Sequence, residues 1–382
     1  MPKPVAVAVA FAILGAIAWG SSAVLELTGG RNLSISLLLG AAFGFVIQRG
    51  RFCFFCNARD LLERREPEGV IALLVALAAG TVGYTLVFGA WLPVPAPDRL
   101  PPTAHIGPVS PVLALAAFVF GVGMSISGSC ISAHLYRLGE GSPTAPFALL
   151  GAFLGFVVGF ITWNPLYLAV ISSGATVWLP HSLGYGGALA GTLVLLAGLA
   201  ALVFARAAPS PAAVPTSGFA SIFSGRWPPV LTGLLVGTIS TFAYFRVAPL
   251  GVTAELGSLA RTGAASVGIL PETLFGLDGF RGCATAIRQL LISDNGLFVA
   301  GLIGASFAAA LLAGQFKPAW PSARHVVRGL IGGVLMGWGA MTALGCTVGV
   351  LLSGIHAGAL SGWVFLVFCF AGVALSLRLA PR

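Results

Sequence analysis

The chain has 382 residues, of which 57% are hydrophobic and 8% charged, with a formal net charge of +9 and a mean hydropathy of +0.98. A soluble globular protein has about a quarter of its residues charged, so this composition excludes that class. The apolar runs are long and do not alternate, which excludes a transmembrane β-barrel. We therefore predict an all-α polytopic membrane protein, whose excess of Lys and Arg fits cytoplasmic loops under the positive-inside rule.

The first predicted element is an added N-terminal helix with its turn, residues 1–32. Its apolar part, residues 5–27, is long enough to span and has no convincing cleavage site, so we expect a retained helix. Residues 33–206 form a first repeat, which begins with the apolar segment 33–48. The run that follows, residues 49–60, is too polar for a span and too apolar for a loop. We expect a short helix there that enters a cavity.

The remaining elements complete two halves separated by a linker. Further spans of the first repeat are predicted at residues 70–91, 112–127, 146–161 and 183–204, with a proline-rich outer loop at 92–111 and a short apolar segment at 166–178. Residues 207–229 are rich in alanine, proline and serine without periodicity and form the linker. The second repeat, residues 230–382, has spans at 230–244, 297–312, 326–341 and 362–379.

Two glycine-broken segments, one in each half, carry cysteines at matched positions. Cys130 ends the segment that starts at Gly121, and Cys346 lies in the segment that starts at Gly337, at an offset of 216 residues. Non-helical backbone at membrane depth is tolerated only where it is buried in protein or lines a cavity. Paired interrupted helices indicate a transport site between two repeats, so we predict that Cys130 and Cys346 lie on a substrate pathway.

The other cysteines are weaker candidates. Cys53 and Cys56 form a C-x-x-C, but neither a second such motif nor paired histidines accompany it, so we predict no metal site and no cofactor. Cys283 lies in a segment with two arginines and has either a packing role or a pathway role. Cys369, inside an all-apolar run, is expected to pack as a small hydrophobic residue.

Several polar residues beside the breaks have two interpretations. His134, one turn after the first break, either donates to the substrate or bonds a carbonyl that the break leaves free. Arg49 and Arg246 occupy matched repeat positions and are anion ligands or, more simply, membrane-interface anchors. Arg137 and Glu140 are predicted to form a surface pair at a helix end.

Three motifs resemble the YeeE/YedE family of prokaryotic sulfur-compound transporters, which includes thiosulfate transporters. They are GFVIQRGRFC at residues 44–53, residues 127–141 and residues 337–349. The resemblance runs from about residue 37 to about residue 378. It implies two inverted pseudo-symmetric repeats whose short broken or re-entrant helices meet at a central pathway. It also implies a relay of cysteines on that pathway, here Cys53, Cys130 and Cys346.

The residues and the resemblance together predict uptake of thiosulfate or a related reduced sulfur anion across the prokaryotic inner membrane, and not an enzyme. A thiol is a weak donor with a polarizable surface, and it is mostly neutral at pH 7 because its reference pKa is about 8.5. Weak contacts at several sites permit both entry and release. The family also implies a small cytoplasmic sulfur-carrier partner of the TusA type, whereas no sequence feature suggests nucleic acid.

Three alternatives stay open. In the first alternative, the chain is a membrane sulfurtransferase or redox enzyme that forms a cysteine persulfide, although only His134 lies near as an activating base. In the second alternative, the chain transports a selenium compound, because some relatives are linked to selenium metabolism. In the third alternative, Cys56 rather than Cys53 is the relay position. The sequence also departs from the family motif at Ser129, where the family commonly has glycine.

Overall fold

The computed structural model describes residues 3–96, 99–207, 223, 225–277, 285–287 and 292–379. Within these residues eight helices are long and apolar enough to cross a membrane, and a helix pair bent by 43° adds a ninth candidate. The predicted class, an all-α polytopic membrane protein, is therefore confirmed.

In residues 3–96 and 99–207 the structure has eight α-helices and one small ribbon. The helices are α1 (Lys3–Ala23), α2 (Gly30–Gly50), α3 (Phe54–Arg59), α4 (Glu68–Trp91), α5 (Pro111–Ser127), α6 (Ile131–Gly139), α7 (Ala145–Ala169) and α8 (Leu179–Arg206). Short irregular turns of helix are η1 (Val24–Glu26), η2 (Asp60–Arg64) and η3 (Ile171–Ser173). The antiparallel ribbon joins β1 (Pro108–Val109) to β2 (Ala175–Thr176).

The second half, after the predicted linker, is also helical in its described residues. Its elements are α10 (Pro229–Arg246), α11 (Val252–Ser266), α12 (Asp294–Leu312), α13 (Ala323–Thr342), η5 (Thr347–Ser353), α14 (Gly354–His356) and α15 (Leu360–Leu379). Most of the predicted linker, residues 207–229, lies outside the described residues.

Two elements differ from expectation. The segment predicted at 146–161 and the first four residues of the segment predicted at 166–178 share one helix, α7, which continues through Pro165 as far as Ala169. A helix at membrane depth keeps its hydrogen bonds on either side of a proline because no water replaces them. The second difference is α11, whose weakly apolar sequence does not indicate a helix of 15 residues.

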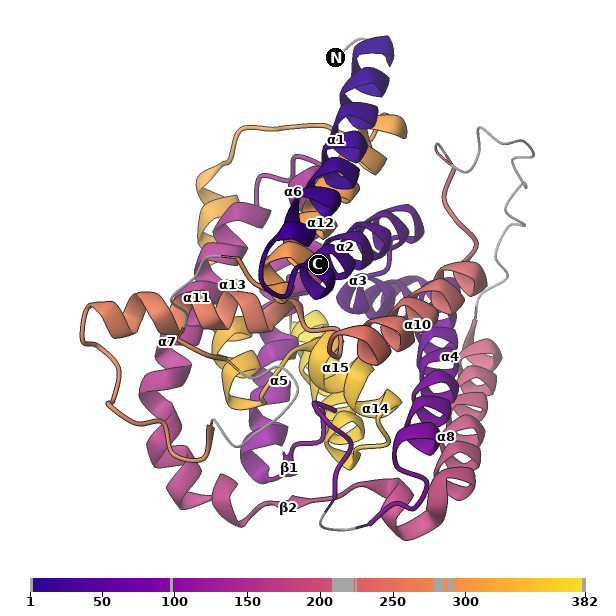
Figure 1. Ribbon diagram of the computed structural model, residues 1–382, viewed down its shortest axis with the longest axis vertical. Helices are drawn as coiled ribbons and strands as arrows, with labels where there is room; N and C mark the ends of the chain where they lie inside the picture. The colour runs from indigo at the N-terminus through magenta and orange to yellow at the C-terminus, as the bar shows by residue number, and fades with distance from the viewer. Residues whose placement is uncertain are drawn as a thin grey trace.

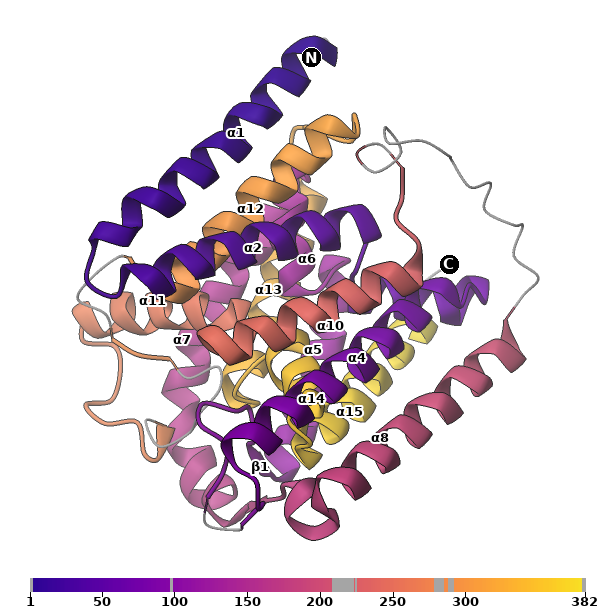
Figure 2. The same cartoon turned by 45° about the vertical axis from the view of Figure 1, so that its right-hand side comes forward.

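Glycines allow the helices to approach closely. Methyl groups at Gly40 and Gly44 of α2 would collide with backbone atoms of α12, and one at Gly337 of α13 would collide with Ala152 of α7. The main helix contacts are α2 with α12, α4 with α10, α13 with α7 and α5, and α5 with α15. Figures 1 and 2 show α1 at one edge, against α12, and α8 at another, against α4. The glycine content therefore reflects helix packing of the kind found in membranes.

Replacing Gly337 with alanine tests this packing. The new methyl group has no space against Ala152, so we expect a loss of about 1–3 kcal/mol in stability and a lower thermal unfolding midpoint in detergent. The matched control is Gly191→Ala in α8, where nothing lies within 4 Å of the added carbon. Equal midpoints for both variants would contradict the close contact.

Candidate functional site

Three cysteines have the same local backbone. Cys53, Cys130 and Cys346 are each in an extended conformation at the N-cap of the short helix that follows, namely α3, α6 and η5. Two residues before each cysteine the chain is left-handed, with φ of 50°, 85° and 61°. These left-handed residues are Arg51, Gly128 and Leu344. Each cysteine therefore lies where one helix has ended and a new, short one begins.

The thiols are weak caps. Cys53 Sγ accepts from the Cys56 amide at 3.4 Å, and Cys346 Sγ accepts from the Val348 amide at 3.4 Å, whereas Cys130 makes no cap hydrogen bond. Ser, Thr, Asn and Asp are the strong N-caps, and sulfur is a poor acceptor. The first-turn amides therefore keep much of the partial positive charge that a helix start offers an anion.

The sulfur atoms of the first half form a buried cluster. Cys53 Sγ lies 3.9 Å from Cys130 Sγ, which lies 3.3 Å from the hydroxyl of Ser132. On the other side of Cys53, Arg137 donates through a guanidinium nitrogen to Cys56 Sγ at 3.3 Å. The sulfur atoms of Cys56, Cys53 and Cys130 thus lie between the guanidinium of Arg137 and the hydroxyl of Ser132. Within the described part of the chain, no three His, Cys, Asp or Glu side chains are placed to hold a metal ion.

Each glycine-containing break has a carbonyl that a distant side chain satisfies. Arg137 donates to the Gly128 carbonyl at 3.4 Å, and His105 bonds the Leu344 carbonyl at 2.7 Å. Because a carbonyl only accepts, His105 must donate through Nε2–H. Burial in the loop lowers the pKa of His105, which keeps the imidazole neutral and this tautomer in place. Both contacts give a carbonyl at a break a side-chain partner.

The match to a family model decides the classification. The model described as "Sulphur transport" covers residues 49–375. The chain belongs to this sulphur-transport family. Membership places it among transporters and not among enzymes, in agreement with the motifs at Cys53, Cys130 and Cys346.

Curated relatives agree with the family over most of their length. The chain is 28% identical to the thiosulfate transporter TsuA of Escherichia coli strain K12 over 359 residues, which cover 88% of this chain and 91% of that protein. It is 29% identical to the thiosulfate transporter TsuA of Spirochaeta thermophila over 354 residues, covering 88% and 95%. The probable transporter YedE of E. coli is 30% identical over 206 residues, covering 52% and 48%.

The predicted surface pair of Arg137 and Glu140 is wrong. Arg137 turns inward to Cys56 and Gly128, while Glu140 accepts from the side-chain amide of Gln48 at 3.1 Å. The break leaves the Gly128 carbonyl without a helical partner, and a guanidinium has enough donors to bond it and the thiol together. A cation therefore lies at the thiol cluster of this sulphur-transport protein, which residue spacing alone does not indicate.

The other polar candidates are dispersed. His134 is buried and bonds the hydroxyl of Ser127 through Nε2 at 3.1 Å, so its described contact is neither a freed carbonyl nor a thiol. Arg49 is buried and donates to the Gly225 carbonyl, which tethers the chain before α10. Arg246 is exposed, with its guanidinium 6.0 Å from its neighbour's phenyl ring. Their matched repeat positions therefore do not give them matched surroundings.

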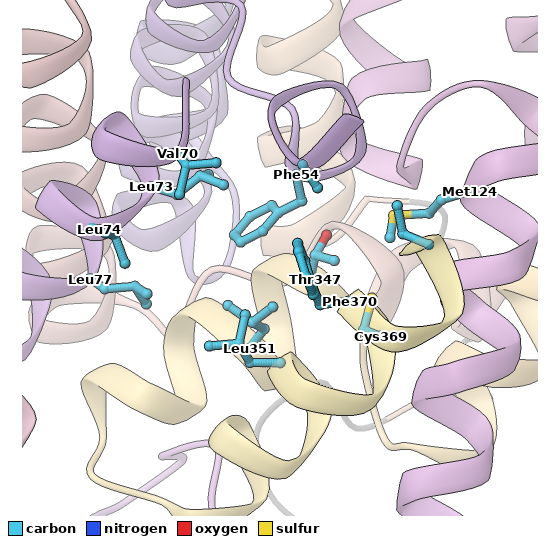
Figure 3. A pocket seen from close by; sticks show the side chains of 13 residues that line it. Phe54, Val70, Leu73, Leu74, Leu77, Met124, Thr347, Leu351, Cys369 and Phe370 are labelled. Carbon is cyan, nitrogen blue, oxygen red and sulfur yellow. The ribbon is translucent and has the colours of Figure 1, made fainter. Parts of the chain in front are cut away.

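The remaining cysteines differ in what the structure says of them. Cys283 lies outside the described residues. Cys369 is buried in the middle of α15 and lines an almost wholly apolar cavity of about 90 Å³. Figure 3 shows this cavity, with Phe54 above and Leu351 below Thr347. It connects the neighbours of Cys53 and Cys346, since Phe54 and Thr347 follow those cysteines directly in the chain.

Oxidative cross-linking tests the thiol cluster. Copper phenanthroline should join Cys53 to Cys130, whose sulfur atoms are 3.9 Å apart, and mass spectrometry of the digested protein should identify the linked peptides. Cys53→Ser and Cys130→Ser, the matched controls, should each abolish this product. A parent protein in which Cys130 links instead to Cys346 or Cys369 would contradict the geometry.

Proposed function

We propose that this protein takes up thiosulfate, or a closely related reduced sulfur anion, across the prokaryotic inner membrane, with Cys53, Cys130 and Cys346 as a relay of neutral thiols. The observation that carries the proposal is the shared backbone of these three residues, each at the start of a short helix beyond a left-handed break. Membership of the sulphur-transport family and similarity to two thiosulfate transporters support the substrate class.

Neutral thiols suit an anion that must bind and leave. Thiosulfate loses its hydration on entering a buried site, and a cation at every relay position, rather than only beside Cys56 at one end, would hold it too tightly to release. A thiol donates weakly and presents a polarizable surface to a sulfur atom. The spacing of 3.9 Å between Cys53 and Cys130 lets one substrate sulfur exchange between them with little displacement. Several weak sites in series give conduction rather than trapping.

We further propose that residues 33–206 and 230–382 are inverted repeats and that residues 1–32 are an addition. A two-fold relation between the halves would make α2 equivalent to α10 and α4 to α12. It would likewise make α5 equivalent to α13 and α7 to α15. The contacts support this, because α2 with α12 mirrors α10 with α4, and α7 with α13 mirrors α15 with α5. The breaks before α6 and η5 are then related positions, and the pathway lies between them.

Arg137 and Cys56 would form the cytoplasmic end of the relay. They adjoin α3 and η2, which lead into the charged segment 59–68, and a run rich in arginine is typical of the cytoplasmic side. An anion that leaves Cys53 meets the guanidinium there. From that end, a small TusA-like carrier would accept the sulfur compound, as the family resemblance implies.

Uptake of radiolabelled thiosulfate into proteoliposomes tests the relay. Cys53→Ala, Cys130→Ala and Cys346→Ala should each lower the rate at least about tenfold, which corresponds to ~1.4 kcal/mol in the barrier, because each removes one site in the series. Cys369→Ala is the matched control, since this thiol lies within a continuous helix and caps nothing; it should keep the parent rate.

Two results would overturn parts of this proposal. Parent uptake that survives all three relay substitutions would retain transport and remove the thiol mechanism. A persulfide mass on a relay cysteine, with turnover in detergent and no uptake into sealed vesicles, would replace transport with sulfur transfer.

Arg137 gives a separate test of the exit. Arg137→Gln keeps an amide donor for the Gly128 carbonyl but removes the charge, so we expect the KM for thiosulfate to rise about tenfold, or ~1.4 kcal/mol. Arg137→Lys should recover part of the loss because it restores the charge. The control is Arg206→Gln at the exposed end of α8. If Arg137→Gln and Arg206→Gln behaved alike, the guanidinium would have only a structural role.

A further inference from the structure

The structure has a fourth break that carries no cysteine. Helix α10 ends at Arg246, and α11 starts after the N-cap residue Gly251. This is the place in the second half that corresponds to the break between α2 and α3, where Cys53 is the N-cap. The thiol that faces Cys130 in the first half therefore has no counterpart facing Cys346.

A hydroxyl takes that place. The side chain of Thr253, in the first turn of α11, lies beside the Cys346 thiol. Ser353 of η5 fixes this arrangement, because its hydroxyl bonds the carbonyl of Leu250 at 3.2 Å and that of Val348 at 3.0 Å. The start of α11 is thereby tied to η5, and Thr253 is held against the cysteine that begins η5.

Two buried hydroxyls lie beside Cys346, and apart from the contact of Thr253 with the Cys346 thiol neither has a hydrogen-bond partner among the described residues. The side chains of Thr253 and Thr347 are each 1% exposed, and neither hydroxyl has a partner of ordinary geometry among the described residues. A buried polar group normally has a partner, and leaving one without costs stability. Thr347 is the residue directly after Cys346 and lines the cavity of Figure 3, where its hydroxyl is the oxygen drawn in red. Donors left unused at a break indicate a ligand with acceptor oxygens.

We propose that Thr253, Thr347 and Cys346 form a subsite for a tetrahedral sulfoxy-anion, with the hydroxyls donating to its oxygens and the thiol facing its terminal sulfur. The subsite rests on the proposed transport of thiosulfate and specifies how this substrate is recognised. The two halves then differ in chemistry. The Cys53–Cys130 pair offers two sulfur atoms, 3.9 Å apart, while the Cys346 side offers one sulfur atom and two hydroxyls. The hydroxyl side orients the anion, and the sulfur pair passes it on.

The test compares valine and serine at both positions. Thr253→Val and Thr347→Val keep the side-chain shape and remove the hydroxyl, whereas Thr253→Ser and Thr347→Ser keep the hydroxyl. Thiosulfate uptake into proteoliposomes gives KM and the maximal rate, and thermal unfolding in detergent without substrate gives the stability. The matched control is Thr81→Val in α4, because Thr81 is also buried but donates to its own helix, to the Leu77 carbonyl at 2.8 Å.

The proposal predicts that the valine substitutions weaken substrate binding without lowering stability. Each valine variant should raise the KM about tenfold, since a hydrogen bond to a charged ligand is lost, and should keep the maximal rate. Its unfolding midpoint should equal or exceed that of the parent, because an unpartnered buried hydroxyl has been removed. The serine variants should keep the parent KM, and so should Thr81→Val.

The possible failures are distinguishable. A KM within twofold of the parent in both valine variants, with the parent active, would overturn the subsite and leave the proposed transport intact. A lowered midpoint in the valine variants, together with a raised KM in the serine variants, would show that these side chains pack rather than bind, and would also overturn it. A parent that takes up no thiosulfate would overturn the proposed function and the subsite with it.

Discussion

The architecture depends on how broken helices are stabilised at membrane depth. A helix that stops inside a bilayer leaves carbonyl and amide groups with no water to bond them. Here the freed carbonyls are bonded by side chains from elsewhere, such as Arg137 at Gly128 and His105 at Leu344. The glycine faces of α2 and α13 bring the surrounding helices into close backbone contact, so the breaks stay enclosed by protein.

Cysteine at the N-cap is a poor choice for stability and, in the proposed relay, a suitable one for transport. Serine or aspartate would bond the first-turn amides more strongly and would leave them less available to an anion. The buried hydroxyls of Thr253 and Thr347, which bond no oxygen or nitrogen atom in the described part of the chain, follow the same logic in the proposed subsite, since a hydroxyl already paired with such an atom would have little to offer a substrate. Functional sites commonly depart from local stability rules in this way. The departures cluster here around the breaks, while the helix contacts outside them follow ordinary membrane packing.

Local sequence pattern predicts the class of protein, most spans and the two cysteine breaks, because glycine spacing and the match of Cys130 with Cys346 are visible within short windows. It does not predict the partners. Arg137 reaches Cys56 across 81 residues and His105 reaches Leu344 across 239, and such contacts depend on how whole helices pack. For the same reason Arg137 resembles a surface residue beside Glu140 when only spacing is considered. Helix α11 is not predicted from the sequence because it has few apolar residues on one face. Contacts with other helices stabilise it.

The space around Cys346 explains why recognition must come from many weak contacts. Two small cavities adjoin the breaks of the second half, one of about 20 Å³ beside Leu250 and Gly251 before α11 and one of about 10 Å³ beside Leu344 and Val350 before η5. The larger cavity of about 90 Å³ that Thr347 lines is almost wholly apolar. The two small cavities have room for about one water molecule each, and the larger one offers water almost no polar partner, so an anion on the proposed route cannot keep its hydration shell. It must exchange water for thiols, hydroxyls and first-turn amides. Because each contact is weak, the exchange offsets the loss of hydration without creating a site from which the anion cannot leave.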